Sequence, residues 1–131
     1  MKFSRVVLVL YGLMFLYFGV LLYVRPAELA NTVPLQMTDP MAVAEIRAFY
    51  GGLEIGLGAF LIAAGLLRSF MRPGLWLLLG ISAGLTLGRI TGITVDHATG
   101  SFIFIALAVE SAGLVLSGIG LRLSGGGTPA A

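Results

Sequence analysis

EIRAFYGGLEIGLG, residues 45–58, opens a long apolar segment and yet carries two opposite charges inside it. Arg47 and Glu54 are seven residues apart, about two turns of an α-helix, so we expect both side chains on one helix face. Tyr50 and Gly58 fall on that face as well. Glu54 then lies roughly 21 Å along the helix from the charged residues that bound the segment. In a bilayer-spanning helix this is near the middle, where a carboxylate costs roughly 3 kcal/mol and needs a partner or a wet cavity.

The composition indicates an integral membrane protein. The chain has 131 residues, of which 58% are hydrophobic and 11% are charged, and its mean hydropathy is +1.02. A soluble domain of this size could not hide so much apolar surface. A net charge of +2 without a basic run does not favour nucleic-acid binding. The lack of cysteine excludes disulfides, thiolate metal sites and iron–sulfur clusters.

Four apolar segments predict an all-α fold, an antiparallel four-helix transmembrane bundle. The expected spans are residues 6–24, 42–67, 74–93 and 101–121, in one domain of residues 1–123 with a flexible tail at 124–131. Arg25-Pro26 ends the first helix, and Asp39-Pro40 suits the start of the second, with Asp39 as the N-cap.

The distribution of basic residues predicts the orientation in the membrane. Four spans put both termini and the loop between the second and third helices on the same side. That side holds Lys2, Arg5, Arg68, Arg72 and Arg122. By the positive-inside rule, we expect both termini in the cytoplasm.

The third predicted span carries small residues at every fourth position, Gly80, Gly84, Gly88 and Gly92. Such a ridge lets another helix approach closely, so we predict that it packs against a helix. That helix could belong to the same chain or to another subunit. Ser82, Thr86 and Arg89 form a polar stripe on roughly the opposite face.

Ionisable residues inside the spans define a candidate polar cluster or ligand site: Arg47, Tyr50, Glu54, Arg89 and Glu110. Arg89 lies roughly 10 Å inside the outer loop, and both glutamates lie at similar, slightly deeper levels. Because an arginine fork can hold two carboxylates, we predict that Arg89 pairs with Glu54, Glu110 or both. The cluster is either an ion-pair network that fixes helix assembly or a functional site.

Several chemistries find no residues to carry them. There is no Glu-x-x-His pair for a di-iron centre, one histidine cannot supply bis-histidine haem ligation, and no Gly-rich phosphate loop follows a strand. We therefore predict no catalytic residues, no metal site and no cofactor.

Two function classes remain. The first is a non-enzymatic membrane protein, either an accessory subunit or a binder of a lipophilic ligand such as a quinone or a lipid. The alternative is a small transporter or proton-coupled carrier that uses Glu54 and Glu110. Expected partners are the bilayer, a lipophilic small molecule, and a membrane-protein partner or a second copy of the chain.

The block from Arg47 to Glu54, the Leu87-Gly88-Arg89 element and residues 96–100 resemble the pattern of a bacterial membrane family catalogued as domain of unknown function 4345. The resemblance covers about residues 5 to 122. More distantly, Gly52 to Arg68 followed by a Pro-led helix is similar to DoxX-like proteins, small four-helix membrane proteins, some linked to oxidoreductase or quinone-associated complexes. The resemblance implies a four-helix fold and permits an accessory role, but it implies no activity. We expect a multi-pass protein of the bacterial inner (plasma) membrane.

Overall fold

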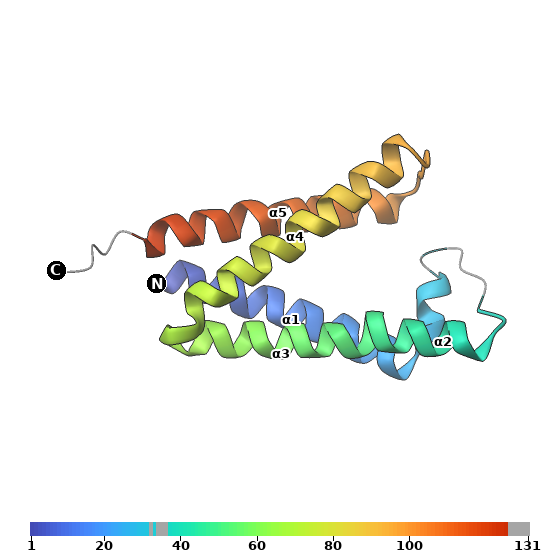
Figure 1. Cartoon of the computed structure of the whole chain (residues 1–131), viewed down its shortest axis with the longest axis horizontal. Helices are drawn as coiled ribbons and strands as arrows, with labels where there is room; N and C mark the ends of the chain where they lie inside the picture. The colour runs from blue at the N-terminus through green and yellow to red at the C-terminus, as the bar shows by residue number, and fades with distance from the viewer. Residues whose placement is uncertain (32, 34–36, 126–131) are drawn as a thin grey trace. The chain divides into compact units, whose positions relative to one another are not determined.

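The computed structural model describes residues 1–31, 33 and 37–125, and every regular element in that part of the chain is helical (Figure 1). In chain order the elements are α1 (Lys2–Val24), η1 (Pro26–Asn31), α2 (Pro40–Ile46), η2 (Arg47–Gly52), α3 (Leu53–Leu66), η3 (Arg68–Phe70), α4 (Met71–Thr94) and α5 (Ser101–Ser124). The predicted tail begins at Ser124, the last residue of α5, and its residues 126–131 lie outside the described residues.

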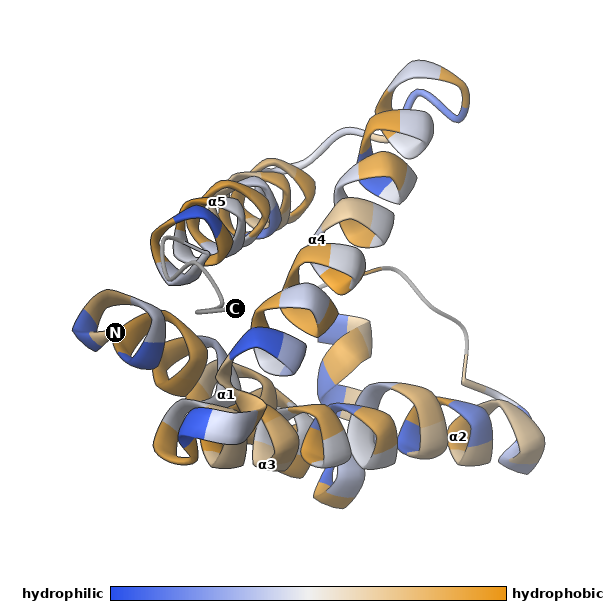
Figure 2. Cartoon of the chain, turned by 60° about the vertical axis from the view of Figure 1, so that its left-hand side comes forward, coloured by the Kyte–Doolittle hydropathy of each residue, from blue (hydrophilic) through white to orange (hydrophobic). Residues whose placement is uncertain are grey.

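Four stretches are long and apolar enough to cross a membrane: Lys2–Val24, Pro40–Leu66, Arg68–Thr94 and Ser101–Ser124. Figure 2 shows their mostly apolar colouring, with hydrophilic patches near several helix ends. Many large apolar side chains are exposed, among them Leu10, Leu87 and Ile105. Such surfaces suit a lipid environment, so the chain is a multi-pass membrane protein.

The start of the second apolar stretch has the predicted cap. Asp39 adopts an extended conformation, its side chain accepts a hydrogen bond of 2.7 Å from the backbone N–H of Met41, and Pro40 occupies the first turn. The carboxylate satisfies an N–H that has no partner within the helix, and proline lacks one to satisfy. The prediction of Asp39-Pro40 as a helix start is confirmed.

The second span, predicted at residues 42–67, is helical over Pro40–Leu66 and contains η2, a π-helical turn of six residues. A π turn bonds each N–H to a carbonyl five residues back, so it holds one residue more than an α-turn. The extra residue rotates the next part of the helix by about 100°. Arg47 and Glu54 therefore do not share a face, contrary to the prediction: Arg47 is exposed and Glu54 is half-buried.

The chain packs as two compact units, one comprising Val9–Ala63 and the other Met1–Leu8 with Ala64–Ala131. In the first unit, α1 and α3 lie side by side (Figure 1). A Cβ added at Gly58 would lie 2.6 Å from the Leu16 backbone N, and one added at Gly19 would lie 2.7 Å from the Ile55 N. Because Gly58 meets Leu16 and Gly19 meets Ile55, the two helices run in opposite directions. Their backbones approach so closely that only glycine fits at these crossings.

In the second unit, α4 and α5 pack along one another and the start of α1 joins them. A Cβ at Gly120 would lie 2.9 Å from Leu75, and the Ser4 hydroxyl donates to the Gly120 carbonyl at 3.5 Å. Ser4, Leu75 and Leu78 are fully buried. Small residues therefore build the close contact at this end of the unit.

The glycine ridge of α4 makes no such contact within its unit. A Cβ at Gly80, Gly84 or Gly88 would meet none of the unit's described atoms within 4 Å, and one at Gly92 would lie 3.8 Å from the Ile103 side chain and 4.0 Å from the Asp96 carboxylate, which are ordinary contact distances. The predicted close packing is thus found at other glycines of the chain. A contact between the ridge and another subunit stays a prediction.

Candidate functional site

Arg89 of α4 and Glu110 of α5 form an ion pair across the seam between the two helices. The guanidinium Nε donates to both carboxylate oxygens, at 3.2 and 3.3 Å, and Nη2 donates to Oε1 at 3.1 Å. Glu110 is nearly buried, with 11% of its side chain exposed, whereas Arg89 is 30% exposed. Both oxygens of Glu110 are therefore held, and the pair joins α4 to α5 with charge-assisted hydrogen bonds.

The surroundings of this pair are aromatic on one side and polar on the other. The Arg89 guanidinium carbon lies 5.3 Å from the centre of the Phe102 ring, a cation–π contact that the sequence pattern did not indicate. Ser82 and Thr86, which lie between Leu79 and Arg89 in the sequence of α4, are buried. Leu79 lies against Gly118 of α5. Heptad-like spacing thus places the polar stripe of α4 on the face that packs against α5.

Glu54 lies in the other unit, where α3 crosses α1. A Cβ added at Gly19 would lie 3.0 Å from the Cβ of Glu54, so the base of the Glu54 side chain lies directly against the backbone of α1. Its Oε2 atom is buried and has no hydrogen-bond partner among the described residues. A buried carboxyl oxygen without a partner is unusual, because its desolvation goes uncompensated.

Arg47 and Tyr50 both belong to the π turn, and both are exposed. The Arg47 guanidinium carbon lies 5.9 Å from the centre of the Tyr23 ring near the end of α1. Gly51 allows this approach, because a Cβ there would lie 2.7 Å from the Tyr23 Cα. Tyr23 is thus a neighbour of the candidate cluster that sequence analysis missed, although an aromatic residue at a helix end was visible in the sequence.

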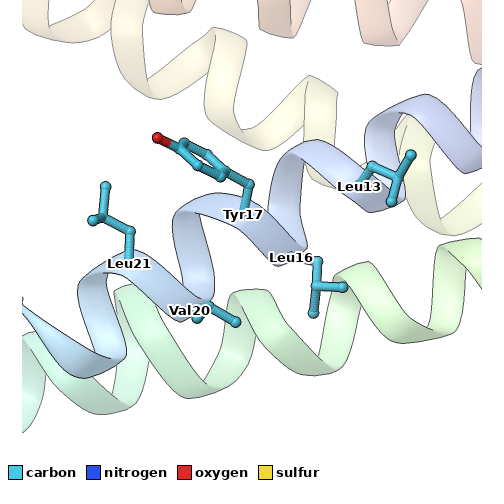
Figure 3. Close-up of a pocket in the computed structure, with 5 residues that line it drawn as sticks. All are labelled: Leu13, Leu16, Tyr17, Val20 and Leu21. Atoms are coloured by element: carbon cyan, nitrogen blue, oxygen red, sulfur yellow. The ribbon is translucent and has the colours of Figure 1, made fainter.

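Two shallow grooves are lined by residues of the unit Val9–Ala63. The first has a volume of about 390 Å³ and is lined by Tyr23, Pro40, Val43, Ala44, Arg47 and Ala48. The second, of about 430 Å³, is lined by Leu13, Leu16, Tyr17, Val20 and Leu21 of α1 (Figure 3). The second groove has no charged lining residue, and it is an apolar helix surface of the kind that lipid chains cover.

The predicted cluster is therefore only partly assembled within each unit. Arg89 and Glu110 meet in one unit, and Arg47 and Tyr50 share the π turn that precedes Glu54 in the other. Among the described residues, no group of three or more histidine, aspartate or glutamate side chains could hold a metal ion. Together, these positions offer one satisfied carboxylate, one unsatisfied carboxyl oxygen, and one arginine beside a groove.

Comparison with known proteins identifies the family of this chain. Residues 3–121 match the model of a family described as Domain of unknown function (DUF4345). No match was found among curated proteins or among solved structures.

Proposed function

We propose that this chain, which belongs to the DUF4345 family, is a non-enzymatic protein that binds a lipophilic small molecule with a polar head, such as a quinone or a lipid. In this proposal the chain is an antiparallel four-helix bundle of the bacterial inner membrane, with both termini in the cytoplasm. Glu54 is the residue that contacts the polar head of the ligand.

The buried, unpartnered Oε2 of Glu54 carries the proposal. Leaving a buried polar atom without a hydrogen bond costs about 1–3 kcal/mol, and a bound molecule that supplies the bond recovers that cost. A carboxylate accepts hydrogen bonds and a protonated carboxyl also donates one, so hydroxyl, amine and carbonyl head groups all suit this position. In an apolar span, the rest of such a ligand must be lipophilic.

The local backbone supports a site at this position. Glu54 lies two residues after the π turn Arg47–Gly52, and single π turns inside α-helices occur frequently at functional sites. Gly52 and Gly56 carry no side chain on either side of the glutamate, and a Cβ at Gly56 would meet none of the described atoms within 4 Å. The helix thus leaves room beside a polar group that has no partner in the described chain.

The Arg89–Glu110 pair supports binding more than transport. A proton-coupled carrier that uses both glutamates needs Glu110 to take up and release a proton. Three hydrogen bonds from Arg89 already engage both oxygens of that side chain and tie it to α4. We therefore assign the pair a role in holding α4 against α5, and the ligand contact to Glu54.

Native mass spectrometry of the protein released from lipid nanodiscs tests the proposal. The parent should carry a lipophilic small molecule, identified after extraction. Glu54→Leu should lower its occupancy on the order of tenfold, because one charge-assisted hydrogen bond is worth about 1.5–3 kcal/mol. Glu54→Gln should retain part of it, since the amide still donates and accepts.

Glu45→Gln is the matched control for Glu54→Gln, because it makes the same chemical change at an exposed position of α2. It should leave the occupancy unchanged, and helical circular dichroism should confirm that every variant is folded. Equal occupancy in the parent and a folded Glu54→Leu variant would show that Glu54 is not the contact residue.

A further inference from the structure

The groove between the end of α1 and the start of the second apolar stretch combines apolar walls with one cation. Pro40, Val43, Ala44 and Ala48 supply small apolar surfaces, and Tyr23 and Arg47 complete the lining. Its volume is about 390 Å³. A single charged residue in an apolar groove gives the groove a polar end and a hydrophobic end.

Arg47 has no carboxylate partner among the described residues. Its guanidinium carbon lies 5.9 Å from the centre of the Tyr23 ring, and its side chain is exposed. Two acids lie near it in sequence, but neither lines the groove. The Asp39 carboxylate accepts the N-cap hydrogen bond from Met41, and Glu45 is exposed and forms no ion pair with Arg47 among the described residues. The guanidinium is therefore available to an anion from outside the chain.

We propose that this groove binds an anionic phospholipid, with its phosphate on Arg47 and the upper part of an acyl chain along Ala48 and Tyr23, on the side of Arg47 that leads into the apolar span. The planar guanidinium fork can bind two oxygens of one phosphate group, and a quinone head has no phosphate group. Tyr23 is the penultimate residue of α1, and tyrosine at a helix end marks the level of lipid head groups. This lipid site is separate from the proposed ligand contact of Glu54.

The same geometry predicts a preference among lipids. A zwitterionic head group brings an ammonium close to Arg47, and the two like charges repel each other. A phosphatidylglycerol head group has the phosphate without the ammonium. We expect phosphatidylglycerol to bind on the order of tenfold more tightly than phosphatidylcholine with identical chains, which corresponds to the strength of one good charge-assisted contact.

The test is a lipid titration of the full-length protein in detergent, followed by native mass spectrometry, with phosphatidylglycerol and phosphatidylcholine of identical acyl chains. Arg47→Gln should lower the phosphatidylglycerol affinity on the order of tenfold and remove the preference for it. Arg47→Lys should lose part of the affinity, because the charge remains and the fork is lost. Ala44→Leu should also lower the affinity, because it fills the groove and leaves Arg47 in place.

Arg25→Gln is the matched control, since Arg25 is an exposed arginine that follows α1 and does not line the groove. It should leave the titration unchanged. Equal losses for Arg25→Gln and Arg47→Gln, unchanged binding in Ala44→Leu, or equal affinities for the two lipids in the parent would each overturn the proposal. Glu54→Leu should not alter this titration, so failure of the lipid site and failure of the Glu54 site are separately visible.

Discussion

The two glutamates inside the predicted spans have the same chemistry and different surroundings. Glu110 accepts three hydrogen bonds from one arginine, whereas one oxygen of Glu54 has no partner in the described chain. Both oxygens of Glu110 are therefore already satisfied, whereas Oε2 of Glu54 is not. We therefore expect Glu110 to act in helix packing and Glu54 to take up new contacts.

Removal of Arg89 should destabilise the protein more than removal of its partner. Arg89→Ala leaves Glu110 nearly buried and without its hydrogen bonds, and we expect a loss of about 2 kcal/mol in the free energy of unfolding. Glu110→Gln keeps a neutral side chain in the same place and should cost less. Thermal or denaturant unfolding in detergent, at one pH and one detergent concentration, measures both.

The double variant Arg89→Ala with Glu110→Gln gives the coupling energy between the two residues. Because the second change removes the stranded charge, the double variant should be more stable than the sum of the single effects predicts, by about 1 kcal/mol. Strictly additive effects would contradict an energetic role for the pair. Glu45→Gln, on an exposed surface of α2, serves as the control for loss of a carboxylate.

The sequence was sufficient for part of the candidate site, and the rest depends on tertiary contacts. The position of each residue along its helix was enough to predict that Arg89 lies within reach of Glu110. The aromatic neighbours Tyr23 and Phe102 could not be assigned, since their contacts depend on which helix faces meet. Whether Glu54 approaches Arg89 stays a prediction, and so does a functional role for the cluster.

At the scale of elements, glycine positions predicted close helix contacts but not their location. The regular Gly80–Gly92 ridge was the visible pattern, yet the close backbone approaches between α1 and α3 use Gly19 and Gly58. A small residue permits a close approach, and the shape of the partner decides whether one occurs. The π turn had no signal either, because one extra residue in a turn hardly alters an apolar segment that lacks a strong periodic pattern.

Gly58 and Gly56 allow a direct test of the α1–α3 contact within one helix. A Cβ at Gly58 would lie 2.6 Å from the Leu16 backbone N and 2.7 Å from the Gly12 carbonyl oxygen, atoms that cannot move without shifting a helix. We expect Gly58→Ala to lower the free energy of unfolding by about 1–3 kcal/mol, as overpacking does. Unfolding in detergent, monitored by circular dichroism, measures the change.

Gly56→Ala is the control, because a Cβ at Gly56 would meet nothing within 4 Å among the described atoms. Alanine is the better helix former, so this variant should be neutral or more stable by up to about 1 kcal/mol. If Gly58→Ala unfolds like the parent, or if both variants lose equal stability, the backbones of α1 and α3 do not touch at Gly58.

At the scale of the whole molecule, basic residues gather where three helix ends meet. The Ser4 hydroxyl lies 3.3 Å from the Ser124 hydroxyl, and Arg72 donates to the Ser124 carbonyl at 3.3 Å. The start of α1, the start of α4 and the end of α5 are thus neighbours in one unit. Lys2, Arg5 and Arg122 are close in sequence to these contacts, so the cationic groups used for the orientation prediction cluster at one end of that unit.

This clustering makes the membrane orientation testable with single cysteines, because the chain has none of its own. Ser69→Cys lies at the basic end, in η3, and Thr99→Cys lies in the connection between α4 and α5; both positions are exposed. The positive-inside rule predicts that the basic end remains in the cytoplasm. In intact cells, a membrane-impermeant maleimide should label Thr99→Cys and not Ser69→Cys, and permeabilisation should make both reactive. If only Ser69→Cys is labelled before permeabilisation, the orientation is the reverse of the predicted one. If both are labelled, the two positions do not lie on opposite sides of a sealed bilayer.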